Sequence, residues 1–136
     1  MKLLLDTHAL LWWLSDDPKL GDHARDLIAD PANDILVSAV SLWEILVKVR
    51  AGKLVADIQE ILDEMKVQGF ELLEIGPAHL LVLATLPMHH KDPFDHLLIA
   101  QAIAEEAIFL SEDGYTPQYP MRYVTCSDPA PGPSQP

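Results

Sequence analysis

The sequence has a single cysteine, Cys126, among its 136 residues. One cysteine cannot form an internal disulfide, so a reducing compartment fits best, and a chain of this length can bury the core of one domain without cross-links. No stretch approaches the roughly 18 to 20 apolar residues of a membrane span, and the apolar run near the N-terminus is too short for a signal peptide. We therefore expect a soluble, cytoplasmic protein with no membrane segment.

Basic residues are also scarce. The sequence has 9 Lys and Arg and 21 Asp and Glu, which gives a formal net charge of -12. An acidic surface argues against broad binding of nucleic acid through a basic face. It remains compatible with a substrate reached through bound cations and with a basic partner. The Cys/His spacing of a zinc site is missing, although His89 and His90 are adjacent, and we favour a loop or substrate-contact role for these histidines.

Apolar runs alternate with helical patterns along the chain. Short strands are predicted at residues 3–5, 35–37, 70–75, 108–110 and 123–124. Helices are predicted at residues 9–14, 20–29, from Ser38 or Ser41 to about 50, 57–67, 77–86 and 93–106. This alternation is typical of an α/β fold, with a central parallel sheet of four to five short strands and helices on both faces. We assign residues 1–126 to this domain and the proline-rich residues 127–136 to a disordered tail.

The first predicted strand is three consecutive leucines followed at once by Asp6. An unbroken apolar run suits a central parallel strand that is buried on both faces. In open α/β sheets, ligands bind outside the carboxyl ends of the strands. Asp6 is therefore either an active-site acid or the N-cap of the following helix, which the same geometry allows.

Two acids on helices have both a structural and a functional interpretation. Glu44 interrupts a mostly apolar helix, so it either pairs with Lys48 four residues later or works at a site. Asp95 follows the expected N-cap Asp92 at the third helical position. An acid at that position can close a capping box and favours the helix dipole.

Asp113 follows the apolar strand 108–110, although an Asp-Gly pair after a strand is most often a turn and Glu112 is an alternative acid. A parallel fold can bring Asp113 to one edge of the sheet together with Asp6, Glu44 and Asp95. Four crowded carboxylates repel one another, and a hard divalent ion relieves this repulsion. Mg²⁺ and Mn²⁺ prefer oxygen ligands and commonly act on phosphates, so the four acids favour metal-dependent hydrolysis.

Four motifs carry a family resemblance: LDTH at residues 5–8, VSAVSLWEI at 37–45, HKDPFD at 90–95 and LSED at 110–113. With them, residues 1 to about 124 resemble PIN-domain proteins of the VapC toxin type, the ribonuclease half of bacterial or archaeal toxin–antitoxin pairs. The resemblance implies a parallel sheet covered by helices and cleavage of RNA with Mg²⁺ or Mn²⁺. The acidic quartet of the family falls on Asp6, Glu44, Asp95 and Asp113.

The resemblance also implies roles and partners. Asp6, Asp95 and Asp113 are proposed as metal ligands, and Glu44 as the residue that holds a metal-bound water or positions the nucleophile. The implied partners are an RNA substrate, a small antitoxin and a second copy of the chain. Two rival functions stay open: a phosphatase with Asp6 as nucleophile, which lacks the usual second acid because that position is His8, and a non-catalytic module whose acids hold a structural ion.

Further expectations concern polar neighbours of the acids and one helix. His96 stands where many relatives have arginine, which alters a contact near the site. Thr7 and Ser111 flank two acids and either bond ligand carboxylates or phosphate, or act as caps. Trp12 and Trp13 lie in a helix that is apolar on all sides, and so is either buried or open to a partner. We expect the antitoxin to bind there, with tryptophan as a hot spot and with arginine or lysine near the acidic site.

Overall fold

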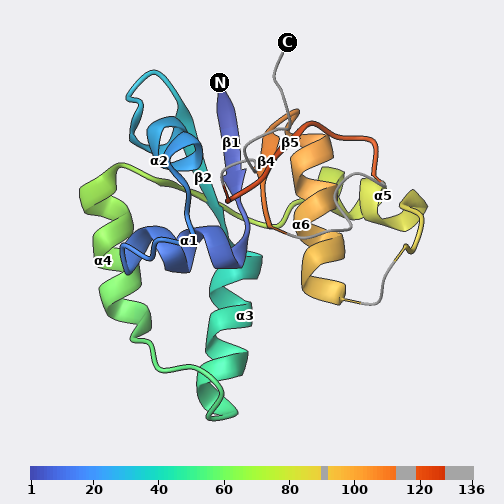
Figure 1. The fold of residues 1–136 in the computed structure, drawn as a ribbon. Coiled ribbons are helices and arrows are strands. Elements are labelled where there is room, and N and C mark those ends of the chain that lie inside the picture. The colour runs from blue at the N-terminus through green and yellow to red at the C-terminus, as the bar shows by residue number, and fades with distance from the viewer. Residues whose placement is uncertain (90–91, 113–118, 128–136) are drawn as a thin grey trace, which may run out of the picture.

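The computed structural model describes residues 1–89, 92–112 and 119–127. These residues form a parallel five-stranded sheet in the order β3-β2-β1-β4-β5 (Figure 1). The strands are β1 (Lys2–Leu5), β2 (Asp34–Ser38), β3 (Glu71–Leu73), β4 (Ile108–Leu110) and β5 (Tyr123–Val124). The helices are α1 (Thr7–Leu14), α2 (Asp22–Ala29), α3 (Ala39–Arg50), α4 (Ile58–Gln68), α5 (Pro77–Thr85) and α6 (Pro93–Ala104). The predicted α/β fold is confirmed.

β1 lies at the centre of the sheet, as its unbroken leucine run predicts. It pairs with β2 on one side and with β4 on the other. Successive side chains of a strand point to opposite faces. Leu3 and Leu5 therefore enter one hydrophobic cluster and Leu4 the other, and all three are fully buried.

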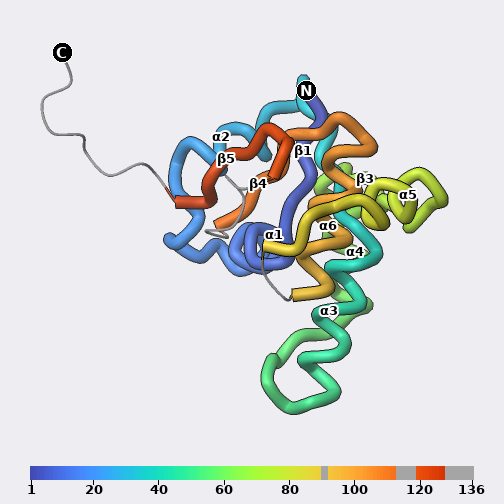
Figure 2. The backbone as a smooth tube through the Cα atoms, turned by 90° about the vertical axis from the view of Figure 1, so that its right-hand side faces the viewer, coloured from blue at the N-terminus to red at the C-terminus, as the bar shows by residue number. Residues whose placement is uncertain are grey.

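Helices cover both faces of the sheet, so each cluster is closed by a different set. The first cluster takes side chains from α1, α2, α3 and α4, including Leu10, Ile28, Ile45 and Ile61. The second takes most of its helical side chains from α6, and α5 packs outside α6 (Figure 1). Figure 2 shows α3 running away from the sheet at the end where β1 and β2 stop. α3 contributes to both clusters and therefore sits at the seam between them.

Most element boundaries follow from local capping. Ser38 accepts a hydrogen bond from the amide of Val40 and starts α3, which decides between the two predicted caps. Asp57 and Asp92 cap α4 and α6 in the same way. α4 ends at Gly69, whose φ of 74° is in the left-handed region that glycine tolerates best.

Four predicted elements are longer than the observed ones, and among them α5 ends at Thr85, one residue before the predicted end. β3 covers only Glu71–Leu73, because it is an edge strand that pairs with three residues of β2. α2 begins at Asp22 rather than Leu20. α6 ends at Ala104, and Glu106 then takes a φ of 53°, which turns the chain into β4.

The remaining expectations concern membrane spans and the C-terminal segment. Within the described ranges, no helix is both long and apolar enough to cross a bilayer. Ser127 donates two hydrogen bonds to Glu112, from its amide at 2.8 Å and from its hydroxyl at 2.9 Å. The rest of the predicted tail, residues 128–136, lies outside the described residues.

Candidate functional site

The carboxyl ends of the central strands meet at one edge of the parallel sheet, where the predicted site lies. Asp6 follows β1 directly, and Ser111 follows β4. The amide of Asp6 donates to the carbonyl of Leu110 at 3.0 Å, which continues the β1–β4 pairing past the strand ends. The side chain of Ser111 also hydrogen bonds to the carboxylate of Asp6. The predicted association of the β1 and β4 ends is thus present.

Asp6 is both the N-cap of α1 and an acid of this edge. Its side chain is 4% exposed, and Oδ1 accepts a hydrogen bond from the amide of Ala9 at 2.7 Å. Burial raises the pKa of Asp6, while the hydrogen bonds from Ala9 and Ser111 act in the opposite direction. The two interpretations left open by the sequence are therefore compatible, because the cap fixes the carboxylate at the end of β1.

Glu44 lies in the same site and is 5% exposed. Its Oε1 accepts a hydrogen bond from Thr7 Oγ1 at 2.6 Å. Its Oε2 accepts one from Lys48 Nζ at 2.8 Å, so the predicted pair within the helix is confirmed. Thr7 is the neighbour of Asp6, and the Thr7–Glu44 hydrogen bond therefore ties α3 to the end of β1.

Asp95 lies in the first turn of α6, where the predicted cap is present. Asp92 Oδ1 accepts hydrogen bonds from the amides of Phe94 at 2.9 Å and Asp95 at 3.2 Å. The ring of Phe94 meets the ring of Trp43 edge to face, with centroids 4.8 Å apart. Trp43 and Phe94 are the sequence neighbours of Glu44 and Asp95. This aromatic contact therefore packs the first turn of α6 against α3 next to Glu44.

The fourth predicted acid, Asp113, lies outside the described residues, as does His90. Among residues 1–89, 92–112 and 119–127, no group of three or more His, Cys, Asp or Glu side chains is arranged to hold a metal ion. The acidic and hydroxyl side chains described at this edge nevertheless offer oxygen ligands. Cys126 lies near this edge, and burial, with further contributions from the carboxylates of Asp6 and Glu112, raises the pKa of its thiol. The oxygen ligands fit a hard cation such as Mg²⁺ or Mn²⁺.

Two of the described histidines, His8 and His89, contact aromatic rings. His8 is exposed and stacks on Trp12, with centroids 5.5 Å apart. His89 meets Tyr119 edge to face at 5.0 Å. His96 is 9% exposed and lies within α6.

The structure contains a buried chain of hydrogen-bonded polar side chains behind the site, which the sequence did not predict. Ser38 donates to Gln101 Oε1, and Gln101 Nε2 lies 3.4 Å from His79 Nδ1. His79 in turn pairs with Glu105 at 2.8 Å, and its Nδ1 accepts from the amide of Gly76 at 3.0 Å. The chain links α5 and α6 to the cap of α3. The signal in the sequence is Gln101, a polar residue within an apolar helical run.

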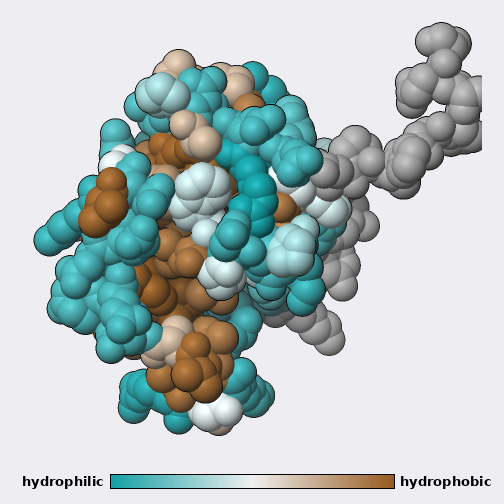
Figure 3. Space-filling view, turned by 60° about the vertical axis from the view of Figure 1, so that its left-hand side comes forward, coloured by the Kyte–Doolittle hydropathy of each residue, from teal (hydrophilic) through white to brown (hydrophobic). Residues whose placement is uncertain are grey.

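The helix that was predicted to be apolar on all sides, α1, is neither fully buried nor fully exposed. Trp12 and Trp13 are half-buried, and Trp13 packs against Phe70 with centroids 6.3 Å apart. Two hollows of about 210 and 330 Å³ lie between α1 and α4 and share Leu14 and Glu64. Figure 3 shows an apolar strip on this side of the molecule, flanked by hydrophilic residues. We call these two hollows the α1–α4 groove.

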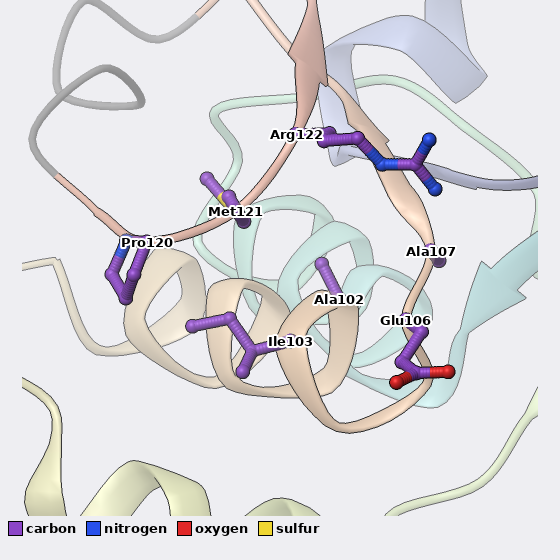
Figure 4. A pocket seen from close by; sticks show the side chains of 7 residues that line it. All are labelled: Ala102, Ile103, Glu106, Ala107, Pro120, Met121 and Arg122. Atoms are coloured by element: carbon purple, nitrogen blue, oxygen red, sulfur yellow. The ribbon is translucent and has the colours of Figure 1, made fainter.

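A larger hollow of about 540 Å³ lies at the other end of the sheet. It is lined by residues of the α6 end and of the segments next to β4 and β5, among them Ile103, Glu106, Met121 and Arg122 (Figure 4). β4 starts at this end, so the hollow is remote from the carboxyl edge that holds Asp6.

Comparison with known proteins agrees with this geometry. No curated protein matches the chain. A chain of VapBC2 from Rickettsia felis, in a structure bound to a promoter DNA fragment, has a TM-score of 0.73 at 20% identity, over 92% of this chain and 98% of that one. A chain of DNA-bound VapBC from Salmonella typhimurium has a TM-score of 0.68 at 14% identity, and a chain of VapBC-1 from nontypeable Haemophilus influenzae one of 0.66 at 13%, each with the same coverage.

These identities show a shared fold. The family model for the PIN domain matches residues 3–119, which include Asp6, Glu44 and Asp95. The chain therefore belongs to the PIN-domain family.

Proposed function

We propose that this protein is a metal-dependent endoribonuclease, the toxin of a toxin–antitoxin pair. The observation that carries the proposal is the hydrogen bond from Thr7 to Glu44, which ties the buried Glu44 of α3 to the residue next to the buried Asp6 at the carboxyl edge of a PIN sheet. Ligands of open α/β sheets bind at this edge. The similar VapBC structures support the placement in a toxin–antitoxin pair.

In this proposal, Asp6, Asp95 and Asp113 hold Mg²⁺ or Mn²⁺. When bound, such an ion offsets the crowded negative charge and favours attack of water on a phosphodiester. Thr7 and Lys48 each donate to one oxygen of Glu44, so the orientation of this carboxylate is fixed before substrate arrives. Glu44 positions the attacking water.

RNA cleavage with Mg²⁺ or Mn²⁺, compared with cleavage in chelator, tests this function. Asp95→Asn should abolish cleavage, and Glu71→Gln, which changes an exposed acid on the edge strand β3, should leave it unchanged. Stabilisation by the metal without cleavage of any RNA would instead support the non-catalytic module. A phosphorylated Asp6 trapped during turnover would support the phosphatase.

The α1–α4 groove suits the proposed antitoxin. It is lined by the apolar Leu14 and Ile61 and by the acidic Glu60 and Glu64, while Asp16 at the same groove is paired with Arg25 at 2.6 Å. Such a surface fits an amphipathic segment with apolar anchors and basic neighbours. The net charge of -12 adds long-range attraction for a basic partner.

A homodimer is the second proposed assembly. Leu80 and Leu81 of α5 are 52% and 71% exposed, and Leu72 of the edge strand β3 is 48% exposed. Large apolar side chains that are exposed and adjoin one another mark interaction surfaces. Sedimentation of the wild type and of Leu81→Glu tests the assignment, because a dimer through α5 should dissociate in the variant.

A further inference from the structure

Ser41 lies in α3 one turn before Glu44 and is fully buried. In the part of the chain that the structure describes, its hydroxyl has no hydrogen-bond partner. A buried hydroxyl without a partner is costly and requires an explanation. Neighbouring hydroxyls at the carboxyl edge of the sheet avoid this free-energy cost by forming hydrogen bonds.

The other hydroxyls described at this edge, those of Thr7, Ser38 and Ser111, take part in hydrogen bonds. Thr7 donates to Glu44, and Ser38 both accepts from the amide of Val40 and donates to Gln101. Ser111 bonds to Asp6. Ser41 therefore differs from its neighbours in being buried beside the site with its bonding capacity unused by the described residues.

Helix geometry directs Ser41 into the site. Residues three, four and seven apart lie on one side of a helix, so Ser41 shares a stripe with Glu44 and Lys48. Val40, on one flank of this stripe, packs into the cluster closed by α6, and Ile45, on the other flank, packs into the cluster closed by α1 and α4. The stripe thus faces the seam between the two clusters, where Thr7 reaches Glu44.

The position of Ser41 along α3 also fits a place at the floor of the site. α3 begins directly after β2, so a residue one turn before Glu44 is one turn closer to the sheet edge. Side chains of a helix tilt toward its N-terminus, which brings this hydroxyl nearer the end of β1. Along α3, Ser41 therefore stands between Glu44 and the end of β2.

We propose that Ser41 Oγ holds a water molecule of the acidic site beside Glu44, and that Ser41 is a positioning residue for that water. A hydroxyl both donates and accepts, as a water ligand requires, and a carboxylate offers about four acceptor sites. Glu44 accepts one described bond at each oxygen, which leaves capacity for a bond from the same water. A buried water with two to four polar partners is a stable part of a structure. The inference rests on the nuclease function proposed above.

Two substitutions and a control test the role of this hydroxyl. Ser41→Ala should lower the Tm in chelator by less than Ser38→Ala does, because the hydroxyl has no hydrogen bond to a described residue and the water keeps its other partners. It should lower kcat for RNA by about tenfold or more with KM within about twofold, because the water loses its position while substrate contacts remain. Ser41→Thr keeps the hydroxyl and should regain most of the activity. Ser38→Ala removes a hydroxyl that makes two hydrogen bonds at the same end of the helix, and it should lower the Tm.

A wild-type kcat in Ser41→Ala would overturn the inference. A loss of Tm in Ser41→Ala as large as that in Ser38→Ala would also overturn it, because the hydroxyl would then have a protein partner. A high-resolution crystal structure of the wild type should show an ordered water within hydrogen-bond distance of both Ser41 Oγ and Glu44. Such a water in a protein that cuts no RNA supports the inference and refutes the nuclease function, whereas an active protein without it refutes the inference alone.

Discussion

The hydrogen bond from Thr7 to Glu44 offers a direct measurement of how strongly the fold holds the site together. Thr7→Val replaces the hydroxyl by a methyl group of similar size and leaves Glu44 Oε1 without this donor. Because Glu44 is only 5% exposed, the lost bond to a charged acceptor is worth about 1.5–3 kcal/mol. Lys48 also contacts Glu44, but the Lys48 side chain is 39% exposed, and pairs of this kind contribute about 0.3–0.5 kcal/mol. Thr7 therefore outweighs Lys48 severalfold.

Urea unfolding in chelator, followed by tryptophan fluorescence, measures this difference. Thr7→Val should lower the free energy of unfolding by about 2 kcal/mol, which corresponds to roughly 8 °C in Tm for a domain of this size. Thr7→Ser keeps the donor and serves as the matched control, and Lys48→Met measures the weaker partner. A loss in Thr7→Val no larger than that in Lys48→Met would show that the bond does not hold α3 to the end of β1.

Further predictions concern charge, binding and reactivity. Asp6→Asn and Asp95→Asn should each abolish cleavage with the fold retained by circular dichroism. Because burial raises the pKa of Asp6, the unfolded chain releases this proton at lower pH than the folded protein, so stability falls as pH rises above about 4. In chelator, the stabilising effect of Asp6→Asn should therefore grow with pH in thermal melts, and a constant difference between pH 4 and 8 would contradict this. Trp13→Ala or Trp12→Ala should weaken antitoxin binding by about 2 kcal/mol in calorimetry while cleavage stays measurable, and unchanged affinity in both folded variants would refute the interface. The raised pKa of Cys126 predicts slow labelling by a thiol reagent in the folded protein at pH 8 and fast labelling in urea, and equally fast labelling in both would count against a buried thiol.

The fold could be predicted largely because its signals are local. Three leucines in a row require a strand buried on both faces, and β1 is such a strand. Asp92 followed by proline starts a helix through capping and a preset φ, and α6 begins there. The length of β3 was predicted less well, because an edge strand ends where its single neighbour stops offering partners.

Only the part of the site that depends on the order and direction of the strands could be predicted. Parallel strands place their carboxyl ends at one edge, which brought Asp6 to the end of β4 as expected. The bond between Thr7 and Glu44 depends on how α3 rotates about its own axis, and tertiary packing sets that rotation. The same rotation leaves the hydroxyl of Ser41 without a hydrogen-bond partner among the described residues. The role of Asp113 stays a prediction.

The double duty of Asp6 has a consequence for motion. Its carboxylate closes the first turn of α1 through the amide of Ala9, and its carbonyl accepts from the amide of Leu10 at 3.1 Å. Helix ends open more readily than helix centres, and each opening of this turn releases the acid from its fixed rotamer. While the turn is closed, the amide of Ala9 is protected from exchange with solvent hydrogen. The exchange rate of that single amide therefore reports the fraction of time for which the carboxylate of Asp6 is held in its capping position at the end of β1.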